Sequence, residues 1–102
     1  MMEYNVDGDG VATISWNLTN RPMNVLNQES MADYSEALNK AIDDDSVKGI
    51  IVTSSHREFM VGADLTALGD GSKADIEKFI FVVLELYRRM EKAGKPVVSA
   101  IN

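Results

Sequence analysis

The amino-acid sequence predicts an α/β fold in which strands alternate with helices. Short apolar runs bounded by turn residues mark strands, and two longer stretches with apolar residues at three- and four-residue steps mark helices. The predicted order is a β-hairpin, a helix, a strand, a turn, a helix and a strand, with no internal repeat. Such alternation is typical of a parallel sheet. We interpret residues 1–102 as one domain at most.

The first predicted element is a hairpin. Tyr4–Val6 and Val11–Trp16 flank Asp7–Gly10, and Asp-Gly pairs supply the positive φ angles that tight hairpin turns need. Asp7–Gly10 also resembles the start of a calcium-binding loop, but that loop needs oxygen ligands where Val11 and Leu18 stand. The turn interpretation is therefore favoured.

A first helix is predicted over residues 28–43. Asn27 is a plausible N-cap, and an apolar stripe follows it, formed by Met31, Tyr34, Leu38, Ala41 and Ile42. The acidic residues 43–45 oppose the helix dipole and mark its end. They could also bind a metal, but a solvated acidic turn is the favoured interpretation.

The strand Gly49–Ser54 follows, and its apolar β-branched residues suggest burial on both faces. Residues 66–68 could form a short helical piece. A long helix is predicted over about residues 74–93, with Gly94 as the C′ residue and Pro96 as the stop. The last predicted strand is Val97–Ile101.

The long helix carries more apolar residues than one stripe needs. The main stripe consists of Ile76, Phe79, Ile80, Val83, Tyr87 and Met90. Phe81, Val82, Leu84 and Leu86 widen the apolar surface to most sides of the helix. This pattern predicts a central helix that is buried on most sides.

Composition excludes several functional classes. The net charge of −6 argues against a general nucleic-acid or anionic-membrane binder. The absence of cysteine excludes disulfides and thiolate metal sites. The first residues lack the pattern of a secretory signal, and the longest apolar run, Ile80–Leu84, is too short to span a bilayer. We therefore expect a cytoplasmic protein with no nucleic-acid or membrane partner.

Few residues are candidates for acid–base or metal chemistry. His56 is the only histidine, so a pair of histidine ligands cannot form, and its position beside Arg57 favours a structural or solvent-exposed role. No glycine-rich nucleotide motif is complete. Asp64 is the best placed carboxylate, but capping of a short helix is its favoured role.

The most informative segment is Phe59–Leu65, which follows the apolar strand. A buried strand that runs into the Gly-Ala-Asp turn at residues 62–64 leaves backbone N–H groups pointing into a cleft. Fixed N–H donors of that kind can stabilise a developing oxyanion.

Five features in this order resemble the crotonase (enoyl-CoA hydratase/isomerase) superfamily. They are an Arg-Pro loop, Asn-Val-Leu-Asn before the first helix, the apolar strand, Phe-Met-Val-Gly-Ala-Asp-Leu with the long helix after it, and Gly-Lys-Pro-Val-Val-Ser-Ala-Ile-Asn. The form Pro-Met-Asn-Val-Leu is similar to the hydratase/isomerase domain of multifunctional fatty-acid oxidation proteins. The resemblance implies a partial ClpP/crotonase-type α/β fold, as the N-terminal part of such a domain.

The resemblance also implies a role for the Gly62 turn. A CoA thioester would lie across it, and the Ala63 N–H would donate to the thioester oxygen as half of an oxyanion hole. The residues implied to contact CoA are Arg21, Pro22, Met23, Val61, Gly62, Asp64 and Leu65. Arg21 could face a phosphate, and Val61 departs from the small alanine common at its position in the family. The substrate carries CoA, and no separate cofactor or metal is implied.

The second oxyanion donor and the acid–base glutamates of the family would follow Asn102. We therefore expect the 102 residues alone to be inactive. A non-catalytic CoA-binding or self-associating module remains an alternative, as do isomerisation, thioester hydrolysis and decarboxylation. We also expect a homo-oligomer, because Phe79–Leu84 and Val97–Ile101 offer apolar surface and a strand edge.

Overall fold

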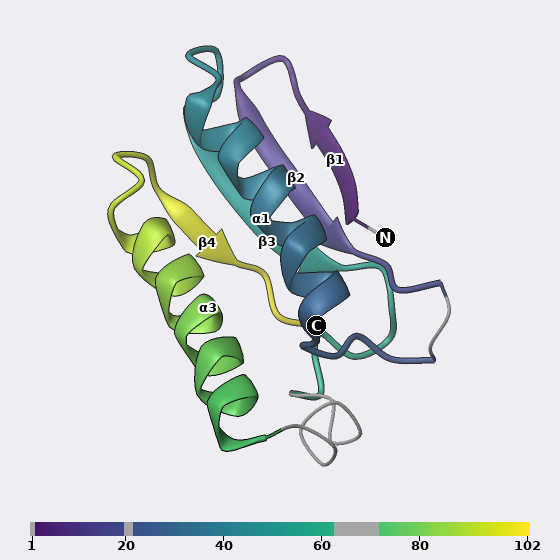
Figure 1. The fold of residues 1–102 in the computed structure, drawn as a ribbon. Helices are drawn as coiled ribbons and strands as arrows, with labels where there is room; N and C mark the ends of the chain where they lie inside the picture. The colour runs from purple at the N-terminus through teal and green to yellow at the C-terminus, as the bar shows by residue number, and fades with distance from the viewer. Residues whose placement is uncertain (1, 20–21, 63–71) are drawn as a thin grey trace.

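A computed structural model describes residues 2–19, 22–62 and 72–102. A mixed four-stranded sheet carries its helices on one side (Figure 1). The elements are β1 (Met2–Val6), β2 (Val11–Trp16), α1 (Gln28–Asp43), β3 (Gly49–Ser54), α3 (Lys73–Glu91) and β4 (Val97–Ser99). The short helical piece expected at residues 66–68 lies outside the described residues.

The sheet has the strand order β1-β2-β3-β4. β1 and β2 form the predicted hairpin and pair antiparallel, with Tyr4 opposite Ile14. β2 pairs parallel with β3, and β3 pairs parallel with β4. The prediction of a parallel sheet is therefore confirmed for β2, β3 and β4, and each parallel pair is joined through a helix, as parallel neighbours require.

The hairpin turn also fixes the start of β3. The Asp7 carboxylate accepts hydrogen bonds from the backbone N–H groups of Asp9 and Val11, as expected for a turn. Gly10 has a φ of 82°, and its carbonyl accepts the Lys48 N–H at 2.6 Å. A Cβ at Gly10 would lie 2.6 Å from the Ser46 carbonyl oxygen, so glycine is required for both the turn and the close approach.

α1 begins and ends at specific hydrogen bonds. Asn27 is its N-cap, as predicted, and exchanges hydrogen bonds with Ser30 in a reciprocal capping arrangement. At the other end, the Lys95 ammonium donates to the carbonyls of Ala41 (2.8 Å) and Asp44 (2.7 Å). Lys95 thus satisfies the Ala41 carbonyl at the end of the helix and is a second donor to the Asp44 carbonyl, which also accepts the Val47 N–H. It joins the segment before β4 to α1.

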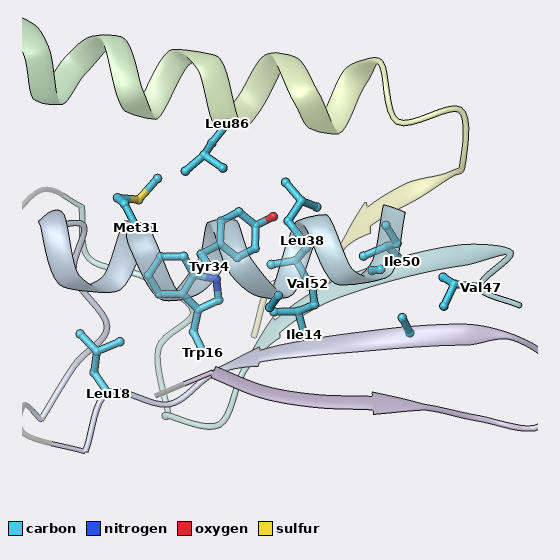
Figure 2. Close-up of a cluster of buried hydrophobic side chains, with 13 residues drawn as sticks. Ile14, Trp16, Leu18, Met31, Tyr34, Leu38, Val47, Ile50, Val52 and Leu86 are labelled. Carbon is cyan, nitrogen blue, oxygen red and sulfur yellow. The ribbon is translucent and has the colours of Figure 1, made fainter. Parts of the chain in front are cut away.

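The core lies between α1 and the sheet (Figure 2). Its largest fully buried side chains come from β2, the loop after β2, α1, the segment between α1 and β3, β3 and α3; the apolar ones are Trp16, Ile14, Leu18, Met31, Leu38, Ile50, Leu86 and Val47. The rings of Trp16 and Tyr34 pack with centroids 5.2 Å apart.

The prediction that β3 is buried on both faces is wrong. Ile50 and Val52 are buried against α1, whereas Ile51 and Thr53, on the other face, are only partly buried. Side chains alternate between the two faces of a strand, and the described helices cover one face of this sheet (Figure 1).

The prediction that the long helix is buried on most sides is also wrong. All residues of α3 are described, and only Leu86 is buried. Phe79, Val83 and Met90 pack partly against the core, whereas Ile80 and Tyr87, assigned to the main stripe, are exposed. α3 packs against α1 along one side only, so one stripe meets the core and the rest faces outward.

The C-terminal elements differ slightly from the predicted bounds. α3 ends at Glu91, with Gly94 at a φ of 73° in the turn that follows. β4 ends at Ser99, two residues earlier than expected. No helix within the described residues has the length and apolar character needed to cross a bilayer.

Candidate active site

The candidate site lies where β2, β3 and β4 reach their carboxyl ends. Trp16, Ser54 and Ser99 are the last residues of these strands. In sheets with parallel strands, loops that leave the carboxyl ends form the usual ligand-binding crevice. The loop before α1 and the segment that leads to Gly62 both lie at this end.

Asn24 holds these segments together. It is fully buried, and its side-chain oxygen accepts the Leu18 N–H at 3.2 Å. Its amide nitrogen lies 2.7 Å from the Ser54 hydroxyl oxygen and 3.2 Å from the carbonyl oxygens of Trp16 and Phe59. One side chain therefore joins the end of β2, the end of β3 and the segment before Gly62.

Two backbone hydrogen bonds fix the Gly62 turn against the loop before α1. The Val61 N–H donates to the Asn24 carbonyl at 3.1 Å, and the Leu26 N–H donates to the Gly62 carbonyl at 2.8 Å. Gly62 has a φ of 106°, a conformation that other residues rarely adopt. The backbone at the start of the turn is therefore fixed both by the hydrogen bonds to Asn24 and Leu26 and by the conformation of Gly62.

Four of the residues implied to contact CoA lie within the described part of the chain. Pro22 and Met23 lie in the loop before α1, and Val61 and Gly62 lie on the segment that pairs with it. Met23 and Val61 are exposed apolar side chains at this junction. The other four residues of the predicted site, Arg21, Ala63, Asp64 and Leu65, lie outside the described residues.

His56 has a structural contact, as the sequence favoured. Its Nε2 lies 3.0 Å from the Leu18 carbonyl oxygen, and its backbone N–H donates to the Ser54 hydroxyl. The Asn102 side-chain amide donates to the His56 carbonyl at 2.9 Å. His56 thus ties the loops after β2 and β3 to the segment after β4.

An apolar cavity of about 190 Å³ adjoins the Gly62 turn. It lies between the sheet, α1 and α3; its lining includes Trp16, Leu26, Met60, Tyr87 and Met90. Leu26 and Met60 connect it to the turn, because Leu26 pairs with Gly62 and Met60 precedes Val61. A cavity of this character suits an acyl chain better than a polar group.

Tyr34, a polar residue in the lining of the cavity, is not suited to acid–base chemistry. The Tyr34 hydroxyl donates to the Met90 sulfur at 3.2 Å, and burial, with a smaller contribution from Tyr87, raises the pKa of Tyr34. Tyr34 therefore stays a neutral phenol at physiological pH. Among the described residues, no group of three histidine, cysteine or carboxylate side chains is placed to hold a metal ion.

Sequence reasoning missed Asn24. It identified the Asn-Val-Leu-Asn segment as a family resemblance but assigned no role to the first asparagine. Its position directly after the Arg-Pro-Met loop is the only local signal, and polar residues in loops are common. The burial that makes Asn24 important depends on contacts with residues up to 35 positions away.

Comparison with known proteins identifies the family. The model of the family described as enoyl-CoA hydratase/isomerase matches residues 7–102. The chain belongs to the enoyl-CoA hydratase/isomerase family. It is 34% identical over 97 residues to the fatty acid oxidation complex subunit alpha of Psychrobacter arcticus, and 32% identical over 98 residues to that of Acinetobacter baumannii. Each match covers 92% of this chain and 14% of the relative.

Solved structures of this family share the fold. Enoyl-CoA hydratase from Thermoplasma volcanium matches 99% of this chain with a TM-score of 0.90 and 26% identity, over 40% of its own length. An enoyl-CoA hydratase/isomerase from Xanthobacter autotrophicus matches 99% of the chain with a TM-score of 0.86 and 26% identity, over 38% of its length. The chain therefore has the crotonase fold and spans about two fifths of these solved relatives.

Proposed function

We propose that the loop before α1 and the Gly62 turn form the thioester-binding side of an enoyl-CoA hydratase/isomerase active site of the fatty-acid β-oxidation type. The observation that carries this proposal is the pair of hydrogen bonds that fixes Val61 and Gly62 against Asn24 and Leu26. A backbone held in place before the substrate arrives can present N–H donors without reorganisation, which favours a developing oxyanion. The Ala63 N–H is the donor in this proposal.

The CoA part of the substrate follows the loop before α1. Pro22, Met23 and Val61 contact it through apolar surface, and Arg21 pairs with a phosphate. Gly62, Asp64 and Leu65 contribute the backbone along its path. The substrate itself supplies CoA, so the reaction needs no further cofactor or metal, and we place it in the cytoplasm.

The acyl chain enters the cavity beside Met60. The cavity is mainly apolar and lies on the α1 side of the sheet. An acyl chain that enters it from the Gly62 turn is therefore removed from contact with water. Its thioester carbonyl then remains at the Gly62 turn, where an enolate oxygen would form during hydration of a 2-enoyl thioester. Turnover also needs acid and base groups. The family resemblance assigns these to no residue of this chain, so the 102 residues bind substrate but are catalytically silent.

Calorimetric titration with a 2-enoyl-CoA tests the oxyanion donor. Ala63→Gly keeps the N–H and should bind the thioester with nearly unchanged affinity. Ala63→Pro removes the N–H and should bind it about tenfold more weakly. Free CoA lacks the thioester carbonyl, so the parent chain and the two variants should bind free CoA with equal affinity. Equal affinity of all three for the thioester, at equal thermal stability, would overturn the role of Ala63.

The loss of the conjugated double bond during the same incubation tests the expected inactivity. Turnover close to that of a complete hydratase would contradict it and would direct attention to Glu58, His56 and Asp64. A protein that binds free CoA and the thioester equally, with no effect of Ala63→Pro, would favour the alternative of a non-catalytic CoA-binding module.

A further inference from the structure

The apolar cavity between the sheet, α1 and α3 extends away from the Gly62 turn. Leu26 and Met60 line it at the turn, beyond the carboxyl ends of the parallel strands. Tyr87 and Met90 line it from the last turns of α3, which runs back toward the level at which β4 begins (Figure 1). An acyl chain that enters beside Met60 therefore advances toward Tyr87 and Met90.

Tyr87 and Met90 form a wall at the far end of this cavity. A second pocket of about 360 Å³ lies at the end of α3, and its lining consists of Tyr87, Met90, Glu91, Lys95 and Val97. Tyr87 and Met90 are the two residues that the linings of the cavity and the pocket share. These two side chains therefore separate the apolar cavity from a pocket that carries charged groups.

Met90 is held in place from the opposite helix. A methionine side chain is unbranched and adapts easily to its surroundings, so its position usually varies. Here the Tyr34 hydroxyl donates a hydrogen bond to the Met90 sulfur at 3.2 Å, which joins α1 to α3 beside the cavity. Met90 also packs against the buried core. The wall therefore has a defined position rather than yielding freely to a long chain.

The volume of the cavity limits how much of an acyl chain can enter it. A dry apolar cavity of about 150 Å³ binds benzene, so the volume of about 190 Å³ in this chain accommodates about eight carbon atoms. In the proposed function, the thioester carbon and its nearest neighbour stay at the Gly62 turn. The whole acyl group that fits therefore has about ten carbons.

We propose that Met90, together with Tyr87, limits the bound acyl group to about ten carbons, so that the site selects short- and medium-chain 2-enoyl thioesters. This inference rests on the proposed acyl-CoA function and adds a chain-length range to it. Within the limit, each methylene that leaves water strengthens binding roughly fourfold. Further methylenes must displace Met90 or stay in water, so the gain in affinity ends there.

Calorimetric titration of the 102-residue chain with 2-enoyl-CoA thioesters of increasing length tests the limit. The dissociation constant should fall by about tenfold for every two carbons between crotonyl-CoA and 2-decenoyl-CoA. It should fall by less than about twofold in total from 2-decenoyl-CoA to 2-tetradecenoyl-CoA. All titrations are made below the concentration at which the longest thioester forms micelles.

Variants of the wall should move the limit. Met90→Ala opens the wall and should bind 2-tetradecenoyl-CoA about tenfold more tightly than the parent chain, with unchanged affinity for crotonyl-CoA. Tyr87→Ala opens the wall at a more exposed position, where folding is less at risk, and should act in the same direction. Met90→Leu keeps the volume of the side chain and should retain the parent limit. Leu84→Ala, on the same helix but in the lining of neither cavity nor pocket, is the control and should leave the whole series unchanged.

The titrations distinguish failure of the limit from failure of the proposed function. The limit would be overturned if the affinity of the parent chain keeps rising through 2-tetradecenoyl-CoA, or if Met90→Ala and Tyr87→Ala both keep the parent limit. In either case binding still depends on acyl length, so the proposed acyl-CoA function would stand. Equal affinity of the parent chain for crotonyl-CoA, 2-decenoyl-CoA and free CoA would instead mean that the cavity takes no acyl chain, and would overturn both proposals.

Discussion

α1 and α3 have similar amphipathic sequences and similar N-caps, yet they differ in how much of each helix is buried. Both are amphipathic, and each begins at a polar side chain that accepts a hydrogen bond from the N3 backbone N–H, Asn27 in α1 and Ser72 in α3. α1 nevertheless buries six residues among its 16, whereas α3 buries only Leu86 among its 19. Local sequence therefore determines that both segments are helical, and the partner surfaces determine how much of each is buried.

The difference arises from what each helix meets. α1 contacts β1, β2 and α3, whereas α3 packs mainly against α1 (Figure 1). Figure 2 shows Leu86 pointing from α3 toward Met31 and Tyr34, above a core that α1 and the sheet have already formed. α1 with the sheet is thus the central region of the described fold, and α3 is attached to it along one stripe.

The largest expected effect concerns Asn24, which joins the loops of the central region. Asn24→Ala should lower the free energy of unfolding by about 4 kcal/mol, because it leaves several buried donors and acceptors without partners. Urea denaturation would measure the loss. Asn5→Ala, at an exposed position, is the control and should change stability by less than about 0.5 kcal/mol. Similar losses for both variants would show that the central region does not depend on this side chain.

Two leucine-to-alanine variants of α3, one at a buried and one at an exposed position, test how this helix packs against the rest of the fold. Leu86→Ala should lower the free energy of unfolding by about 3 kcal/mol, because Leu86 is fully buried. Leu84→Ala removes the same atoms from an exposed position and should cost less than about 0.5 kcal/mol when the chain is dilute enough to be monomeric. Denaturation curves followed by circular dichroism would give both values. Equal losses would mean that α3 packs in a different rotation about its axis.

The sequence predicted the parts of the fold that depend on neighbours along the chain. The hairpin, the Asn27 cap, the bounds of α1 and the strand at residues 49–54 follow from spacing and turn residues, and the structure confirms them. It did not predict that the side of α3 with Leu86 is buried and the side with Ile80 and Tyr87 is exposed, because both sides are almost equally apolar. That choice depends on the shape of the surface that α1 presents.

The candidate site was predictable to a smaller extent. The Gly62 turn was found because a strand, a glycine and a family resemblance coincide in sequence, and the structure adds the hydrogen bonds that fix Val61 and Gly62. Asn24 was not found, since its partners lie 6 to 35 residues away. A buried polar side chain becomes recognisable only when the segments that it joins are placed in space.

A smaller effect is expected at Lys95, which joins the two regions. Lys95→Met keeps the length of the side chain but removes the donor to the carbonyls of Ala41 and Asp44, and should lower the free energy of unfolding by about 1 kcal/mol. Lys92→Met, at an exposed position nearby, is the matched control. Thermal unfolding of the two variants would distinguish them. Loss of stability only in the control would contradict the capping role of Lys95.

The smallest expected effect concerns Asp44, the residue after α1. Hydrogen bonds from the Ser46 hydroxyl and backbone N–H, with smaller contributions from Lys95 and Lys40, lower the pKa of this carboxyl. A carboxyl whose pKa is lower in the folded state contributes stability above its unfolded pKa and loses that contribution as the pH falls through the folded value.

The free energy of unfolding should therefore decline as the pH drops below about 4. Ser46→Ala removes the largest of these interactions but keeps the backbone N–H, so it should make the decline shallower without abolishing it. Urea midpoints recorded from about pH 6 to about pH 2 would give the two slopes. Because every other carboxyl is common to both proteins, the difference in slope reports on Asp44 alone, and parallel curves would mean that the Ser46 hydroxyl does not stabilise its charged form.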